Sequence, residues 1–257
     1  MIQEYLKSIN PDDIVIIIDG FDVVMTEHID VFMDKYNKIN KSIVIGISNL
    51  NPFTSYICKR VFKIVKYNQK QYFICAGMYV GRADDLAIMY NLINQYLGFK
   101  NYNDDQVLLS KFLNSSNPII IDFINSKIVL DTEVTLFNNT ARKDTLGTIF
   151  KYTGEINLKY DSVSDTLVNQ YGDSSSFIHG PGSIDLKPYI EKIGYTDVPD
   201  VIPYSNSRVT HYTTLFINGM FWYDWVIIFI ILVLFIIIAV ILGKKNRTKI
   251  LKKKKLT

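Results

Sequence analysis

An unbroken run of β-branched residues dominates the hydrophobic pattern near the start of the chain. Residues 14–18 read IVIII, and the carboxylates of Asp19 and Asp22 follow directly. Such a run is typical of a strand buried on both faces, as in a parallel sheet covered by helices. Ligands bind at the carboxyl ends of strands in open α/β sheets, so two acids here suit a hard cation that bridges to phosphate oxygens. An acidic cap on the following helix explains the same residues about equally well.

Apolar runs and helical periodicity alternate through the first three quarters of the chain. We expect the end of a helix in 1–10, helices at 29–39, 84–97 and 104–113, and strands at 42–48, 72–80, 118–123, 128–130 and 176–179. Asp84 is the expected N-cap of its helix, and Ala76 and Gly77 are expected to interrupt the strand 72–80. Residues 49–56 and 150–175 predict loops. Strands that alternate with helices indicate an α/β domain, which we place at 1–195.

The C-terminal quarter has a different pattern. Residues 225–243 form a run of 19 residues without a charge, which is long enough to cross a bilayer as a helix. Aromatic residues precede this run and basic residues follow it, as expected at the two membrane interfaces. We therefore expect a linker and aromatic juxtamembrane segment at 196–224, a transmembrane helix at 225–243 and a basic tail at 244–257.

The charges around this segment predict its orientation in the membrane. The positive-inside rule places the basic tail in the cytosol and the preceding domain in a lumen or outside the cell. The last four residues, KKLT, match the dilysine signal for retrieval to the endoplasmic reticulum. The Ile-, Asn-, Lys- and Tyr-rich composition suits an AT-rich genome such as that of a large DNA virus, for which a viral membrane is the expected location. Because the first residues carry no signal peptide, a tail-anchored protein with a cytosolic domain is the alternative.

Composition excludes several classes of protein. The net charge of +3 comes from the tail, because residues 1–223 hold 20 basic and 24 acidic residues. We therefore expect no nucleic-acid partner. Cys58 and Cys75 are the two cysteines of the chain, too few for a disulfide scaffold or a cysteine-rich zinc module. Whether they pair is left open by the sequence.

Three separate motifs carry candidate chemistry. Asp19-Gly-Phe-Asp22 follows the first strand, Asn-Asp-Asp-Gln at 103–106 opens a helix, and His-Gly-Pro-Gly at 179–182 closes the domain. Their order resembles the glycosyltransferase domain of the procollagen lysyl hydroxylase and procollagen galactosyltransferase group, over about residues 10–190. Residues 72–81 fall where that family has a Gly-Gly donor segment. The resemblance implies a glycosyltransferase-A-like (Rossmann-like) mixed sheet flanked by helices, here lacking the family's first β-α-β region.

The resemblance also implies a function and its residues. The metal ligands would be Asp19, Asp22 and His179, and the metal would be Mn²⁺, which accepts oxygen and imidazole ligands. The donor, a UDP-sugar, would be bound by the two aspartates together with Gly77, Gly180 and Gly182. Asp104, Asp105 and Gln106 would be the catalytic group beside the sugar and the acceptor. The expected reaction is transfer of galactose or glucose to a hydroxyl of a glycan or protein, such as hydroxylysine of collagen-like chains, at a lipid bilayer.

Other interpretations of the same residues stay open. Asp104 and Asp105 suit the first turn of a helix, where acids cap N–H groups and interact with the helix dipole. His179 alone is more often a hydrogen-bonded structural residue. The alternative function is a catalytically inactive membrane protein with the glycosyltransferase fold, which acts as a viral envelope, attachment or structural protein.

Overall fold

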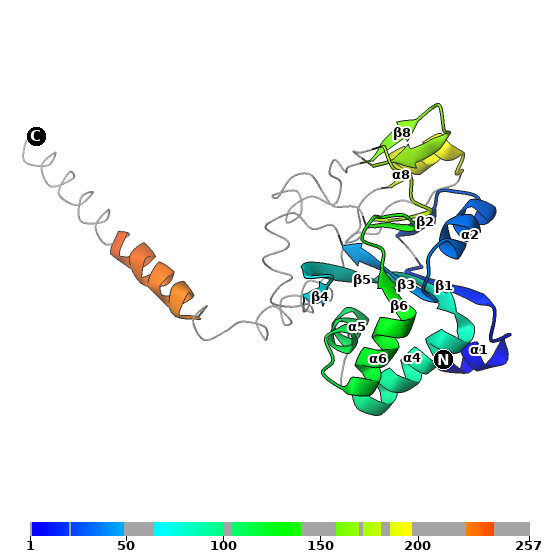
Figure 1. Cartoon of the computed structure of the whole chain (residues 1–257). Helices are drawn as coiled ribbons and strands as arrows, with labels where there is room; N and C mark the ends of the chain where they lie inside the picture. The colour runs from blue at the N-terminus through cyan, green and yellow to red at the C-terminus, as the bar shows by residue number, and fades with distance from the viewer. Residues whose placement is uncertain are drawn as a thin grey trace, which may run out of the picture. The chain divides into compact units, whose positions relative to one another are not determined.

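The computed structural model describes residues 2–20, 22–48, 64–99, 104–139, 158–169, 172–180, 186–196 and 225–238. The chain divides into two compact units, Met1–Thr210 and His211–Thr257, and each is described by itself. Strands and helices of the first unit are shown in Figure 1.

A mixed sheet forms the centre of the first unit. Its main path runs β1-β5-β3-β7-β10-β2, with β4 paired to β5 and β6 paired to β3. The strands are β1 (Ile14–Ile18), β2 (Val23–Met25), β3 (Ile43–Ser48), β4 (Val65–Tyr67), β5 (Lys70–Arg82), β6 (Ile128–Leu130), β7 (Phe137–Asn139) and β10 (Phe177–His179). β3 pairs parallel with β6 and β7, and β7 with β10, whereas the remaining pairs are antiparallel. This mixed α/β arrangement fits the predicted glycosyltransferase-A-like class.

The environment of β1 differs from the prediction. Among the described residues β1 pairs only with β5, and the pairing is antiparallel. Its residues are half-buried, and Ile18 is 41% exposed, so the strand is not buried on both faces in a parallel sheet. A run of β-branched residues reports apolar surroundings, but it contains no information on the direction of the neighbouring strand.

A short link joins the two edge strands of the sheet path, β1 and β2. Only residues 19–22 join β1 to β2, and this link spans at most roughly 18 Å between the strand ends. In a flat sheet the same two strands, five spacings apart in the path, would lie roughly 24 Å from each other. The sheet is therefore curved or twisted enough to bring the joined ends of β1 and β2 closer than a flat sheet would allow.

Helices cover the sheet on two sides. Helices α4 (Ala83–Tyr96), α5 (Asp105–Leu113) and α6 (Pro118–Lys127) lie on one side, and α2 (Ile29–Asn37) lies on the other (Figure 1). Each side has its own apolar cluster. The α4 core includes Leu86, Met89, Phe112, Ile43, Ile74, Ala76 and Tyr79, and the α2 core includes Phe32, Cys75, Met78, Val80, Phe137 and Phe177. The smaller helices are α1 (Ile2–Ser8), α8 (Lys187–Ile190) and the 3-10 turn η2 (Glu191–Ile193).

Strand β5 carries a bulge where the sequence predicts an interruption. Its pairing with β3 shifts register, with Tyr79 opposite Ile45 but Ile74 opposite Ile47. Cys75 and Met78, three positions apart, would face opposite sides of a regular strand, yet both pack in the α2 core. The bulge therefore turns Cys75 toward the same side as Met78.

Three local predictions were wrong. Residues 118–123 belong to helix α6, because Asn117 caps its N-terminus and Pro118 begins it, with Ile120 and Phe123 buried on one face. The N-cap of α4 is Arg82, not Asp84, and the backbone oxygens of Asp13 and Pro11 accept from its first N–H groups. Part of 150–175 forms a hairpin, β8 (Lys159–Asp161) and β9 (Thr166–Val168). The predicted loop at 49–56 lies outside the described residues.

The described part of the second unit is a helix at 225–238. The remaining residues of the predicted span, 239–243, lie outside the described part. Across the described residues no helix has the length and apolar character that a membrane crossing requires.

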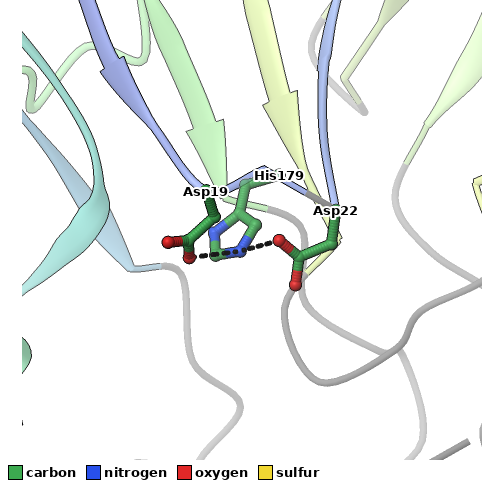
Figure 2. Close-up of side chains that lie close together, drawn as sticks. All are labelled: Asp19, Asp22 and His179. Atoms are coloured by element: carbon green, nitrogen blue, oxygen red, sulfur yellow. Dashed lines mark ion pairs between the residues drawn. The ribbon is translucent and has the colours of Figure 1, made fainter. Parts of the chain in front are cut away.

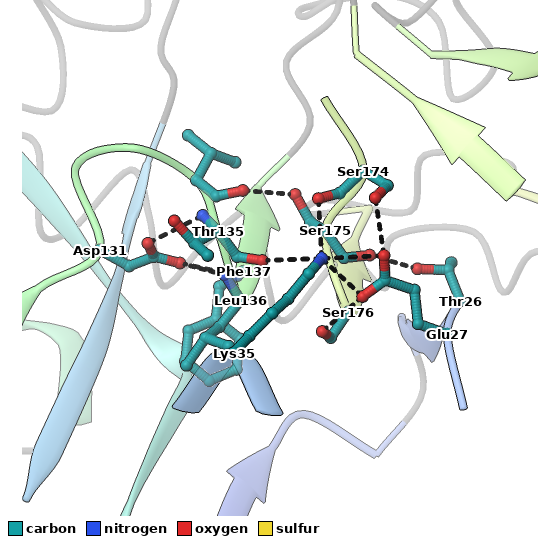
Figure 3. Close-up of polar contacts among 11 residues, drawn as sticks. Thr26, Glu27, Lys35, Asp131, Thr135, Leu136, Phe137, Ser174, Ser175 and Ser176 are labelled. Atoms are coloured by element: carbon teal, nitrogen blue, oxygen red, sulfur yellow. Dashed lines mark hydrogen bonds and ion pairs between the residues drawn. The ribbon is translucent and has the colours of Figure 1, made fainter. Parts of the chain in front are cut away.

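A polar network links α2 to the segments that flank β2, β7 and β10 (Figure 3). The carboxylate of Glu27, after β2, accepts from Lys35 Nζ of α2 at 2.7 and 2.8 Å, and from the hydroxyls of Ser174 and Ser176 at 2.7 Å each. Lys35 also donates to the carbonyls of Thr135 and Ser174. Burial by itself would raise the pKa of Glu27, but the hydrogen bonds from Lys35 and the two serines outweigh it and leave that pKa lowered.

We predict that Glu27→Gln lowers the free energy of unfolding by roughly 2–3 kcal/mol at pH 7, because it removes a largely buried charge that holds Lys35. Since the folded-state pKa of Glu27 lies below its ordinary value of 4.5, this stabilisation is complete above that pH and is lost as the pH falls through the lowered pKa. Urea unfolding from pH 7 to pH 3 should show the difference from wild type shrinking in acid. The exposed Glu133→Gln is the control, and a pH-independent difference would contradict the assignment.

Candidate metal centre

Three of the predicted site residues come together at the ends of β1, β2 and β10. Asp19 follows β1, Asp22 precedes β2, and His179 is the last residue of β10. The imidazole Nε2 lies 3.3 Å from Asp22 Oδ1 and 3.6 Å from Asp19 Oδ2. Figure 2 shows the ring between the two carboxylates. One ligand atom from each residue lies within 4.8 Å of the others, so the group could hold a metal ion.

The site joins a buried base to more accessible acids. The His179 side chain is 7% exposed, whereas those of Asp22 and Asp19 are 24% and 52% exposed. Burial by itself would lower the pKa of His179, but hydrogen bonds to Asp22 and Cys75 outweigh it and raise the pKa to about 10. Without a metal ion the raised pKa favours the protonated imidazole at neutral pH, and its single positive charge offsets part of the charge of the two carboxylates.

Backbone contacts fix the three side chains. Gly180 N donates to the Asp22 carbonyl at 2.8 Å, which extends the β10–β2 pairing by one bond past His179. Asp19 N donates to the Gly77 carbonyl at 2.9 Å. A Cβ on Gly77 would overlap the Asp19 carboxylate, so the glycine leaves the space that this carboxylate occupies. Gly180 therefore holds the backbone of Asp22, and Gly77 holds the backbone of Asp19 and leaves room for its carboxylate. The third predicted glycine, Gly182, lies outside the described residues.

The second predicted group lies at the start of α5. Asp104 is the N-cap and its carboxylate accepts from Val107 N at 2.9 Å, as the capping interpretation expects. The Gln106 amide bonds the backbone of β5, accepting from Ala76 N at 2.8 Å and donating to the Ile74 carbonyl at 2.6 Å. Gln106 therefore fastens α5 to the strand, and the exposed acid of this group is Asp105.

Both acids of α5 line a cavity of about 510 Å³ whose wall includes Ala76, Tyr79, Tyr90 and Phe99. Burial raises the pKa of Tyr79 well above its ordinary value, and the neighbouring Tyr90 and the charges of Asp105 and Asp19 raise it further. Ala76 lines the cavity and the next residue of β5, Gly77, lies against the Asp19 carboxylate, so the cavity and the Asp19–Asp22–His179 cluster adjoin the same part of β5.

Two residues that the structure shows in polar contacts, Cys75 and Glu27, have no clear signal in the sequence. Cys75 contacts His179, since its Sγ lies 3.2 Å from Nδ1, and the bulge that allows this leaves only a weak signal in the sequence at Ala76 and Gly77. Glu27 was not distinguished from other acids, because its partner Ser174 lies in a predicted loop and its partner Ser176 begins a short predicted strand, and neither position indicates a bond to a distant acid.

We predict that Gly77→Ala weakens Mn²⁺ binding by about 10-fold or more, since the added methyl displaces the Asp19 carboxylate. The fold should be retained, because the φ of Gly77 is not positive. Gly20→Ala is the matched control in the adjoining link, where a Cβ would meet no atom within 4 Å. Titration followed by electron paramagnetic resonance measures both variants, and equal affinities would contradict the role of Gly77.

Comparison with known proteins agrees with this geometry. No curated protein matches the chain at a significant level. The family model of the PLOD GT domain matches residues 1–195. The chain therefore belongs to this family, the glycosyltransferase domain of the procollagen lysyl hydroxylase and galactosyltransferase group.

Proposed function

We propose that this protein is a membrane-anchored, metal-dependent glycosyltransferase that moves galactose or glucose from a UDP-sugar to a hydroxyl of a glycan or protein. One observation carries the proposal: a glycosyltransferase domain brings Asp19, Asp22 and His179 together from two distant parts of the chain. Asp22 and His179 are 157 positions apart in sequence, so their proximity is a product of the fold.

The ligand set fits Mn²⁺. Two carboxylate oxygens and one imidazole nitrogen suit an ion that accepts both kinds of ligand, and the partial exposure of both acids leaves room for substrate oxygens. When bound, the ion neutralises the diphosphate and stabilises the leaving UDP. The chain's own part is to hold Nε2 toward the acids and to keep the Asp19 carboxylate beside Gly77.

The neighbouring cavity is where we place the sugar and its acceptor. Asp105 offers a carboxylate that can orient hydroxyls or stabilise positive charge at the anomeric carbon, and Asp104 stands beside it as the helix cap. Gln106 positions both acids by holding α5 against β5.

We place the domain at a membrane because 225–243 is uncharged and is followed by a basic tail. In this proposal the tail is cytosolic and the domain faces the lumen of the endoplasmic reticulum or the outside of a viral membrane. Asn40, exposed in an Asn-Lys-Ser sequon, should then carry an N-glycan in cells that is lost in Asn40→Gln. An unglycosylated Asn40 would favour the tail-anchored orientation with a cytosolic domain.

We predict that the full-length chain in detergent binds UDP in the presence of Mn²⁺ and loses this binding in EDTA. Asp22→Ala and His179→Ala should weaken UDP binding by about 100-fold or more, since removal of a direct ligand exceeds the usual effect of an outer-shell change. Calorimetry measures the affinities. Asp122→Ala, an exposed acid on α6, is the matched control and should behave as wild type.

The same assay separates the two functions. Absence of UDP binding at millimolar concentration, with the fold intact, would contradict the enzyme. Binding without release of UDP from UDP-galactose or UDP-glucose, with or without hydroxyl acceptors, would favour the inactive membrane protein with a glycosyltransferase fold.

A further inference from the structure

The two ring nitrogens of His179 face different surroundings. Nε2 points to Asp19 and Asp22, whereas Nδ1 lies 3.2 Å from the sulfur of Cys75. Both residues are buried: counted over all atoms of the residue, Cys75 is 3% exposed and His179 is 5% exposed. The thiol is free, and it packs in the α2 core with Met78, Phe137 and Phe177.

The bulge in β5 is what makes this contact. Without the register shift opposite Ile45 and Ile47, Cys75 and Met78 would face opposite sides of the sheet. The shifted strand directs the Cys75 side chain into the α2 core, behind the imidazole. Bulges next to functional sites commonly re-aim one side chain in this way.

A cysteine, a histidine and an aspartate in contact also suggest a thiol nucleophile. That chemistry needs a sulfur that a substrate can reach. Cys75 is 3% exposed and packed among apolar side chains, so its surroundings exclude direct attack on a substrate. Within the described part of the chain, its one polar contact is to His179, so we look for its chemical effect through that ring.

We propose that Cys75 is a positioning residue that accepts a hydrogen bond from His179 Nδ1–H and holds Nε2 toward the metal position. This inference rests on the proposed function, because it concerns the same metal centre. An imidazole that binds a metal through Nε2 keeps its proton on Nδ1, and a buried N–H needs an acceptor. Most metal-binding histidines find that acceptor in a carboxylate or a carbonyl. In this chain the Cys75 sulfur is the acceptor for Nδ1–H, both when Nε2 carries a proton and when Nε2 binds a metal.

Two substitutions separate positioning from simple packing. Cys75→Val keeps an apolar, strand-favouring side chain but has no acceptor, whereas Cys75→Ser keeps an acceptor but places a polar group in the α2 core. Packing alone predicts that the Val variant resembles wild type more closely than the Ser variant in both stability and Mn²⁺ affinity. Positioning predicts that the two variants rank differently in the two measurements: Cys75→Val is the more stable variant, but Cys75→Ser binds Mn²⁺ more tightly.

The test uses the full-length chain in detergent and measures melting temperature, Mn²⁺ affinity and the imidazole proton. We expect Mn²⁺ to bind Cys75→Val about 10- to 100-fold more weakly than wild type, and Cys75→Ser within a few-fold of it. In metal-free protein with ¹⁵N-labelled histidine, a Nδ1–H resonance protected from exchange should appear in wild type and Cys75→Ser. It should lose that protection in Cys75→Val. The chain has three histidines, and His179→Asn assigns the resonance.

Each result decides a separate question. A wild type that binds Mn²⁺ together with a Cys75→Val that binds it equally well overturns the role of Cys75 alone. A wild type that binds no Mn²⁺ overturns the proposed function, and this inference with it. If Cys75→Val fails to fold, the wild-type resonance decides: a protected Nδ1–H supports the proposal, and an unprotected or absent one overturns it.

Discussion

Two carboxylates that share one buried imidazole impose the constraint on which the rest of this structure depends. Two unit charges about 4 Å apart repel by about 4 kcal/mol at the effective dielectric typical of a protein surface. One oxygen of Asp19 and one of Asp22 lie within 4.8 Å of each other, so a positive charge between them relieves their repulsion. The protonated His179, with its raised pKa, supplies that charge without a metal. A divalent ion would replace the proton and balance both acids, which is why the cluster suits a metal.

This constraint extends into the fold. The curved sheet lets β1 and β2, the two ends of its path, be joined by four residues, and Asp19 and Asp22 of this link lie beside His179 at the end of β10. The Glu27 network holds the β2 and β10 segments against α2, and Gly180 adds one bond on the site side of that pairing. On the opposite side, the bulge of β5 provides both the space beside Gly77 and the sulfur behind the ring.

The sequence predicted the proximity of Asp19, Asp22 and His179 better than it predicted the structure around them. The order of motifs was enough to bring Asp19, Asp22 and His179 together, because a family pattern carries long-range information that periodicity lacks. Periodicity predicts β3 and α2 well but contains no information on the direction of strand pairing, so the prediction of β1 as a buried parallel strand was wrong. Residues 118–123 were taken for a strand because their apolar run hides a one-sided helix. The roles of Cys75 and Gln106 depend on a bulge and on backbone partners, which local sequence does not specify.

The central claim is that this cluster binds a metal through one imidazole and two carboxylates. Pulsed electron paramagnetic resonance of the Mn²⁺-loaded, full-length protein tests it most directly, since coupling to ¹⁴N reports a nitrogen ligand. The account predicts coupling from a single imidazole nitrogen that disappears in His179→Ala. Bound Mn²⁺ without nitrogen coupling, or coupling that survives the loss of His179, would contradict it.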